Sequence, residues 1–362
     1  MSKTCRLSLD RPALFDPQMH LEFLNTQELA PAAHREIEAF LDRQSDSHPF
    51  QFPNWTGGRD GREREDTYCA IMREQGEMRW FARCGVVFPA GKWLRPIRSL
   101  VVYRGPACGD ADLTLYGLAK LVEKSKELGF AYVEIAPEWV ERPEWNVGGT
   151  LCREGWQPLP DRRSSLRLDL AAGNDELLRS FRKATRYEIR RSEQQGIVTR
   201  FAQDEADLQE FQRIYFEMAR KKNFVAVEPS HLLHVLRWIV NEKDRGALLL
   251  AFKEATLLGG TLVVRAATRS WYVIGATTKD DRLSAGHLLQ WHAIQWAKEH
   301  GCADYDFGGY REGVSTGPAL FKRGFCQAVV QFSPAYRYPL NRRLCSILDF
   351  IKNARSKWRK GK

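Results

Sequence analysis

The sequence of 362 residues has no run of apolar residues as long as the roughly 18 that a membrane-spanning helix needs. Its first residues, MSKTCRLSLDRP, also lack the apolar stretch of a signal peptide. The eight cysteines are scattered without a CxxC pair, which favours reduced, structural thiols. His231 and His234 have no paired acid at metal-ligand spacing, so no metal site is expected. Together these absences predict a cytoplasmic protein.

Two stretches of sequence recur about 170 residues apart. The segment KELGFAYVE at 126–134 is echoed by KEHGCADYD at 298–306, and LCREGW at 151–156 is echoed by LFKRGF at 320–325. In each copy an apolar helix, 115–128 or 288–300, ends at a glycine and a short strand follows. Apolar runs upstream of each helix predict antiparallel strands. We interpret the chain as a tandem duplication, and its length also suggests two domains of about 150 residues.

This order of elements resembles the acyltransfer fold known as GNAT. The resemblance implies an α/β (α+β) architecture of two tandem GNAT-like domains, each a mixed, mostly antiparallel sheet flanked by helices. We expect the first domain over residues 1–165, a basic connecting strand and helix over 166–199, the second domain over 200–340, and a basic amphipathic tail over 341–362.

Most of the net charge of +10 lies near the end of the chain. Residues 337–362 contain nine basic residues against one acid, Asp349, and so carry +8 of it. Apolar residues fall at helical spacing among these cations, as in an amphipathic helix: Leu344, Ile347, Leu348, Ile351 and Trp358. Such a helix could lie on anionic lipid or bind RNA phosphates. The alternative is a helix docked on the domain with a frayed basic end.

A second basic segment lies between the two copies. Residues 174–191 begin with an N-cap residue, Asn174, and two acids, and the segment runs on to Gly196, which predicts one helix with marked ends. Five cations fall within an arc of roughly 100° on this helix: Arg179, Arg182, Lys183, Arg186 and Arg190. A solvated face usually mixes in acids, so this stripe favours phosphate binding, with a plain exposed face as the alternative.

Longer motifs resemble the FemABX family, the aminoacyltransferases that build peptidoglycan interpeptide bridges. The central match is SLRLDL at 165–170, TRYEIRR at 185–191 and GIV at 196–198. The C-terminal match is YDFGG at 305–309, followed by LFKRGF at 320–325. Weaker matches are FPNW at 52–55, RGP at 104–106 and ARKKNF at 219–224. The resemblance covers nearly the whole chain in the right order.

The chain departs from the family pattern at three points. Cys326 follows Phe325 where the family usually has glycine. No long coiled-coil insertion divides the second domain, so the likeness is to compact members. Gly57 occupies the position where compact members can carry a phosphate-binding lysine, and Arg59 is the expected substitute.

The resemblance implies transfer of an amino acid from aminoacyl-tRNA to the side-chain amine of a peptidoglycan stem peptide carried on UDP or on a lipid. The donor is an activated ester, so the reaction needs orientation and oxyanion stabilisation but no enzyme nucleophile and no cofactor. Lys322, with Phe321 packed beside it, would hold the tRNA end or stabilise the oxyanion in the second domain, while the first would hold the acceptor. Substrate binding is expected at Arg59, Arg104, Lys221, Lys222, Tyr305, Asp306 and Arg311. We expect a monomer, cytoplasmic but touching the inner face of an anionic membrane through its C-terminal tail.

Two other enzyme classes remain open at this point. An acyl-CoA-dependent N-acyltransferase of the GNAT type would hold a pyrophosphate on the loop before the central helix, where residues 282–287, RLSAGH, match the required pattern in part. An aminoacyl-tRNA-dependent enzyme that makes amide bonds in natural products would look much the same as a cell-wall enzyme. A non-catalytic binding module is disfavoured by the motif lysine, Lys322.

Overall fold

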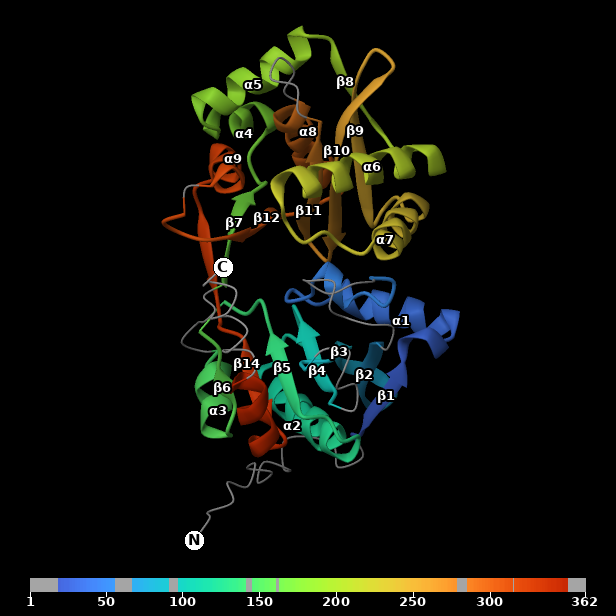
Figure 1. The fold of residues 1–362 in the computed structure, drawn as a ribbon, viewed down its shortest axis with the longest axis vertical. Coiled ribbons are helices and arrows are strands. Elements are labelled where there is room, and N and C mark those ends of the chain that lie inside the picture. The colour runs from blue at the N-terminus through green and yellow to red at the C-terminus, as the bar shows by residue number, and fades with distance from the viewer. Residues whose placement is uncertain are drawn as a thin grey trace. The chain divides into compact units, whose positions relative to one another are not determined.

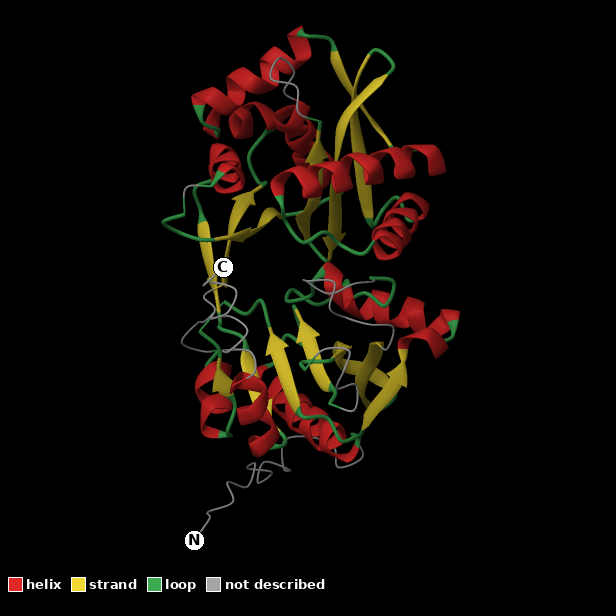
Figure 2. Ribbon diagram, in the orientation of Figure 1, coloured by secondary structure: helices red, strands yellow, loops and turns green. Residues whose placement is uncertain are grey.

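The computed structural model describes residues 19–55, 67–90, 97–140, 145–160, 163–278, 285–314 and 316–350. Its chain divides into two compact units (Figure 1). Unit 1 consists of residues 1–53, 62–162 and 332–362, and unit 2 of residues 54–61 and 163–331. Each unit contains one seven-stranded sheet with helices packed against it (Figure 2).

Unit 1 has the strand order β1-β2-β3-β4-β5-β14-β6. Its elements are β1 (Leu21–Asn25), the short helix Thr26–Glu28, α1 (Pro31–Leu41), the short helix Pro49–Gln51, β2 (Thr67–Glu74), β3 (Glu77–Val87), β4 (Ser99–Tyr103), α2 (Ala111–Glu127), β5 (Tyr132–Ala136), α3 (Val147–Arg153), β6 (Gln157–Pro158) and β14 (Tyr336–Pro339). Residues 342–350 are also helical. Neighbouring strands of this sheet are antiparallel except β4 and β5, which are parallel. The buried core of unit 1 includes Trp80, Leu118 and Val133.

Unit 2 has the strand order β13-β7-β12-β11-β10-β9-β8. Its elements are β7 (Arg163–Asp169), α4 (Asn174–Ser180), α5 (Lys183–Gln194), β8 (Ile197–Phe201), α6 (Glu205–Lys222), α7 (Pro229–Asn241), β9 (Gly246–Lys253), β10 (Thr256–Ala266), β11 (Arg269–Thr277), α8 (Ala285–Glu299), β12 (Asp304–Tyr310), α9 (Gly317–Phe325) and β13 (Val329–Phe332). Helices α6 and α7 lie on one face of the sheet and α8, with α5 beside it, on the other (Figure 1). The core on the α8 side includes Phe181, Leu289 and Phe307.

The two sheets confirm the predicted repeat, because a parallel pair, β4 and β5 or β11 and β12, flanks the long helix in each copy. The glycines that end those helices, Gly129 and Gly301, both have φ of +72°, the left-handed conformation that a helix C-terminus favours. In each case the residue after the glycine donates its main-chain N–H back to the helix, Phe130 to Ser125 and Cys302 to Ala297, both at 3.0 Å.

The strand order reveals an exchange between the copies. β7 follows β6 in the chain, yet it pairs with β12 in the sheet of unit 2. β14 follows β13, yet it inserts between β5 and β6 in unit 1. The expected limits at 165 and 340 therefore differ from the units, since unit 2 already begins at Arg163 and residues 332–340 belong to unit 1. The basic segment 166–199 is part of unit 2.

No helix in the described part of the chain is long and apolar enough to cross a membrane.

Candidate active site

The sheet of unit 2 opens between β11 and β12. These parallel strands pair over only three positions, ending at Trp271 and Asp306, although β11 continues to Thr277 and β12 to Tyr310. A register shift between β10 and β11, opposite Leu262 and Val263, also marks a bulge in β11 near this point. Beyond the last pair, the facing edges of the two strands present main-chain groups that do not pair with each other, so an extended ligand could be bound there.

The corresponding strands of unit 1 stay closed. β4 and β5 pair over four positions up to Tyr103 and Ala136, and the next residue, Arg104, still donates its main-chain N–H to Ala136 at 3.0 Å. The β3–β4 ladder shows no register shift. In the described residues, the opening is therefore a feature of unit 2.

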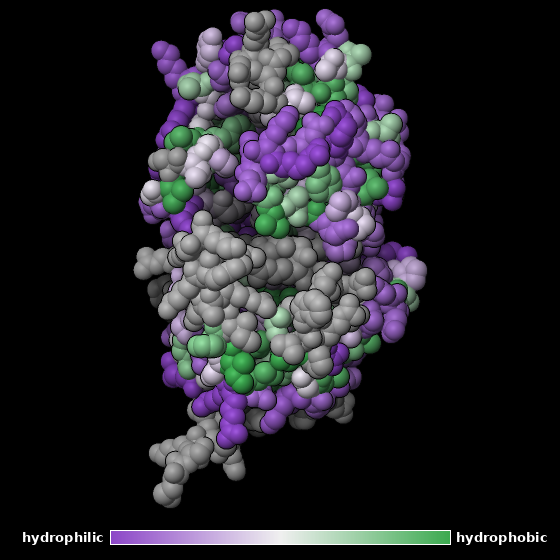
Figure 3. All heavy atoms as spheres, in the orientation of Figure 1, coloured by the Kyte–Doolittle hydropathy of each residue, from purple (hydrophilic) through white to green (hydrophobic). Residues whose placement is uncertain are grey.

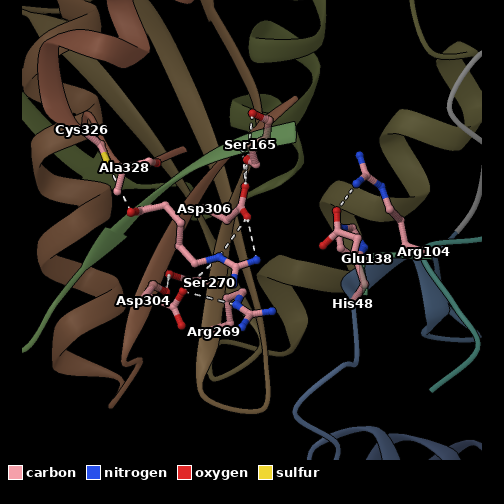
Figure 4. A network of polar contacts seen from close by, with 12 residues as sticks. His48, Arg104, Glu138, Ser165, Arg269, Ser270, Asp304, Asp306, Cys326 and Ala328 are labelled. Carbon is pink, nitrogen blue, oxygen red and sulfur yellow. Dashed lines mark hydrogen bonds and ion pairs between the residues drawn. The ribbon is translucent and has the colours of Figure 1, made fainter. Parts of the chain in front are cut away.

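A buried aspartate shapes β12 at the opening. Asp306, 1% exposed, accepts a hydrogen bond from the Ser165 hydroxyl (Figure 4). It also accepts one from the main-chain N–H of Gly308 at 2.7 Å, and it pairs with Arg167 at 3.5 Å. The β7–β12 register shifts between Asp306 and Gly309. Gly308 has φ of +69°, and a Cβ on it would lie 3.4 Å from the Tyr272 carbonyl oxygen of β11. Asp306 thus holds a glycine bulge that faces β11.

Lys322 reaches this bulge from α9. Its Nζ donates to the carbonyl oxygens of Gly308 at 3.3 Å and Gly309 at 2.9 Å, and it lies 5.9 Å from the centroid of the Tyr272 ring. Burial raises the pKa of Tyr272 to about 12, so its phenol is neutral at physiological pH. The lysine therefore contacts both strands just beyond the point where they separate, and places a positive charge there.

Phe321 packs next to Lys322 and connects α9 to the first turn of α8. Its ring centroid lies 4.9 Å from that of His287 and 5.3 Å from that of Phe325. Burial lowers the pKa of His287, so the ring is neutral at pH 7, and its Nδ1 has no hydrogen-bond partner within the described part of the chain. The sequence motifs identified Phe321 and Lys322 but not Tyr272 or His287, which reach the site from β11 and α8.

α9 is held against α5 by a close helix contact at Gly324. The carbonyl oxygen of Gly324 accepts a hydrogen bond from the main-chain N–H of Arg182 at 2.9 Å. A Cβ on Gly324 would come within 3.0 Å of the buried Thr185 hydroxyl. A glycine here lets the helix that carries Lys322 approach the basic segment.

The prediction of one basic helix over residues 174–191 is wrong. The segment forms α4 and α5, separated at Phe181 and Arg182, and α4 has Gly173 rather than Asn174 as its N-cap. Phe181 is 2% exposed and packs edge-to-face against Trp291 and Phe325, so burial of this ring breaks the helix.

The break also divides the predicted cationic stripe. Arg179 lies on α4, and Arg182 is the N-cap of α5, with a side-chain hydrogen bond to Gln327 at 3.4 Å. Arg186 donates to the main-chain oxygens of Arg179, at 2.9 Å, and Phe181. The guanidinium of Arg186 therefore caps the end of α4, and the five cations do not share one face.

A smaller basic face remains on α5, centred on an exposed tyrosine. Tyr187 is 61% exposed. At 100° per residue, Lys183, Arg190 and Arg191 lie within about 60° of it, and Glu188 pairs with Arg191 at 3.7 Å. The sequence offered a signal for this residue, since cations flank Tyr187 at positions i−4, i+3 and i+4.

The remaining predicted residues of unit 2 do not gather at one point. Tyr305 is fully buried and its hydroxyl accepts a hydrogen bond from Gln290, so neither Tyr305 nor Asp306 is exposed for direct contact with a substrate. Lys221 and Lys222 are exposed in the last turn of α6, whose outward side is hydrophilic (Figure 3). Arg311 is exposed directly after β12.

In unit 1, Arg104 is paired with a buried carboxylate. It binds Glu138, whose side chain is 7% exposed and lies 3.8 Å from His48 Nε2 (Figure 4). Gln51 fixes the strand end before it by donating to the Tyr103 carbonyl oxygen at 2.5 Å. Arg59 lies outside the described residues, as do residues 282–284 of the segment RLSAGH.

Comparison with known proteins identifies the same fold. Residues 179–323 match the family model described as Acetyltransferase (GNAT) domain. A crystal structure of FemX superposes with a TM-score of 0.72 at 16% identity, covering 90% of this chain and 99% of FemX. The structure of L-PGS from Bacillus licheniformis superposes with a TM-score of 0.57 at 13% identity, covering 88% of this chain and 95% of that one. The predicted tandem GNAT-like fold is thereby confirmed.

Part of the chain is also similar in sequence to a curated protein. The chain is 28% identical over 120 residues to the lipid II:glycine glycyltransferase of Staphylococcus haemolyticus (strain JCSC1435). The match covers 32% of this chain and 29% of the relative, so the chain spans less than a third of that relative's length. The resemblance to FemABX enzymes predicted from the motifs is confirmed.

Proposed function

We propose that this chain is an aminoacyltransferase that moves an amino acid from aminoacyl-tRNA to the amine of a peptidoglycan precursor's stem peptide. The observation that carries the proposal is the position of Lys322, whose ammonium lies where β11 and β12 separate in unit 2. Similarity to lipid II:glycine glycyltransferases supports the acceptor class.

The chemistry needs little more than alignment and a positive charge. The acceptor amine attacks the ester carbonyl of the donor, a C–N bond forms, and the C–O bond to the ribose breaks. The proton lost by the amine goes to the departing ribose oxygen. Negative charge develops on the carbonyl oxygen in between, and a preorganised cation such as Lys322 stabilises it. Asp306 and Tyr272 act as positioning residues, since they shape the strands that hold Lys322.

We assign binding of the aminoacyl-tRNA donor to unit 2, because its sheet opens between β11 and β12. Tyr187 and the cations beside it, Lys183, Arg190 and Arg191, suit a nucleic acid, because an exposed ring can stack on a base while the cations bind phosphates. Lys221 and Lys222 would add to this positive surface. Arg179, Arg182 and Arg186 are expected to contribute charge but to serve mainly the junction of α4 with α5 and α9.

We assign recognition of an anionic group of the acceptor to Arg104 of unit 1, while substrate binding at Arg59 and Arg311 stays a prediction from the sequence. Glu138 holds Arg104 in one orientation, which favours bidentate recognition of an anion over loose attraction. The enzyme would act as a cytoplasmic monomer. Its acceptor would be carried on a lipid or on UDP.

The test uses purified protein with labelled aminoacyl-tRNAs or labelled acetyl-CoA, each offered a lipid-linked and a UDP-linked muramyl peptide with a free amine. We expect transfer from tRNA only. Lys322→Met should slow it by roughly 10²-fold, while Lys243→Met, a matched change at an exposed lysine after α7, should not. Transfer from acetyl-CoA but never from tRNA would refute the proposal and favour an N-acyltransferase.

A further inference from the structure

The helix over residues 342–350 is fixed to unit 1 along one side. Cys345 and Leu348 are buried in a cluster with Ala90, Ala131 and Tyr132. Asp349 pairs with Arg337 of β14 at 2.9 Å, and Arg337 also binds Glu134 of β5 at 3.0 Å. The helix is therefore docked, as one of the two readings of the tail sequence expected.

Its other side carries an exposed apolar surface beside cations. Arg343, Ile347 and Phe350 follow one another at i, i+4 and i+7, so they lie along one line of the helix. Ile347 is 56% exposed and Phe350 is 75% exposed. Arg342 and Arg343 are exposed as well. Docking thus uses one side of the helix and leaves an amphipathic side outward.

All charged residues that follow this helix in the sequence are basic. Residues 351–362 contain six basic residues and no acid. Their structure lies outside the described part of the chain, but their charge adds to that of Arg342 and Arg343. A strongly cationic end next to two exposed apolar side chains complements a surface that is both anionic and apolar, which is the property of an anionic lipid leaflet. RNA would use the cations but has no apolar layer to receive Ile347.

We propose that the helix 342–350 is a lipid-contacting surface that works while docked: Ile347 and Phe350 enter the boundary between headgroups and acyl chains, Arg342 and Arg343 bind lipid phosphates, and Leu348 and Cys345 keep the helix on unit 1. Both predictions for the tail then apply, because the helix is docked on unit 1 and its outward side contacts anionic lipid. The inference goes beyond the proposed function, because vesicle binding does not depend on which donor the enzyme uses.

The test is sedimentation of the full chain with phosphatidylcholine vesicles that contain or lack phosphatidylglycerol. The parent should bind the anionic vesicles. Replacing both Ile347 and Phe350 by Ser should weaken binding by about 10²-fold, since burying each apolar side chain contributes more than about a factor of ten. Replacing Arg342 and Arg343 by Gln should weaken it about 25-fold at low salt, at roughly fivefold per cation, and little at high salt.

Matched controls separate this surface from general stickiness and from damage to the fold. Val198→Ser with Phe201→Ser changes two exposed apolar residues of β8, 61% and 53% exposed, and should leave vesicle binding unchanged. The Ile347/Phe350 variant should keep its melting temperature and its transfer to a UDP-linked acceptor. If it loses stability, the single change Phe350→Ser, at the more exposed position, provides the same test.

Unchanged vesicle binding in the Ile347/Phe350 double Ser variant or in Phe350→Ser would overturn the proposal. So would binding that tRNA removes completely while these two variants bind as the parent does, because that result would assign the surface to nucleic acid. A parent that binds vesicles but transfers nothing from tRNA would contradict the proposed function and leave this inference intact.

Discussion

Replacing Gly324 by alanine tests how α9 is positioned. In an ordinary helix interior this change stabilises by about 1 kcal/mol. Here the new Cβ would come within 3.0 Å of the Thr185 hydroxyl oxygen, and Thr185 is 3% exposed. Thr185 is also β-branched, so its side chain has few alternative rotamers. The hydrogen bond from Arg182 to the Gly324 carbonyl, 2.9 Å, resists a simple shift of one helix away from the other.

The magnitude follows from the balance of these two effects. Overpacking a buried contact costs about 1 to 3 kcal/mol, which exceeds the gain in helix propensity at all but its lower limit. We expect Gly324→Ala to lose about 1 kcal/mol and a few degrees of melting temperature. Transfer should slow as well, because Phe321 and Lys322 move with α9.

A second substitution makes the reasoning refutable. Thr185→Ala removes the hydroxyl, and the next atom of Thr185, its Cβ, would lie at an ordinary 3.5 Å from the new methyl group. The double variant should therefore recover stability and transfer relative to Gly324→Ala, measured by thermal unfolding and by the tRNA assay. A single variant more stable than the parent, or a double variant no better than the single one, would show that the contact does not limit the approach of α9.

Three further predictions follow from individual contacts. Lys322→Met should lower the melting temperature by a few degrees in addition to slowing transfer, because the ammonium donates to two main-chain carbonyls; Lys322→Arg should restore stability better than rate, and an unchanged melting temperature would contradict the contact. Arg337→Met should cost about 1 to 3 kcal/mol in unit 1, since it leaves the half-buried Glu134 without its partner; urea unfolding that matches the parent would argue against that role. Burial lowers the pKa of His287, so unfolding takes up a proton below pH about 6.5. The free energy of unfolding should therefore fall as the pH drops through that value. His287→Gln should flatten this fall, and an equal dependence of the free energy of unfolding on pH in parent and variant would exclude the histidine as its source.

Local signals in the sequence predicted much of the fold. The helix expected over 115–128 corresponds to α2 (Ala111–Glu127), and that over 288–300 to α8 (Ala285–Glu299). Both were recognisable because apolar periodicity and a terminal glycine are properties of neighbouring residues. The same holds for Lys322 and Phe321, which were identified by a short motif and do lie at the opening of the sheet.

The failures involve residues whose partners are distant in sequence. Phe181 looks like part of a continuous helix, but its burial against Trp291 and Phe325 separates α4 from α5. Tyr305 and Asp306 look like site residues because they belong to the motif, yet both side chains are buried. Asp306 shapes β12 through its hydrogen bonds with Ser165 and Gly308, and substrate binding at either residue stays a prediction.

The sequence by itself determined that the chain is a duplicated fold, because two segments recur in the same order, and where its long helices end, because apolar periodicity and a terminal glycine are properties of neighbouring residues. It also singled out Lys322 through the resemblance to a known family, and the role of that lysine in transfer stays a prediction. Only the tertiary structure decided that β7 and β14 exchange places between the two sheets, and that the parallel strands separate in unit 2 but stay paired in unit 1. The physical reason is that strand pairing joins residues far apart in the chain: β12 pairs with β7, about 140 residues earlier, and β14 pairs with β5, about 200 residues earlier.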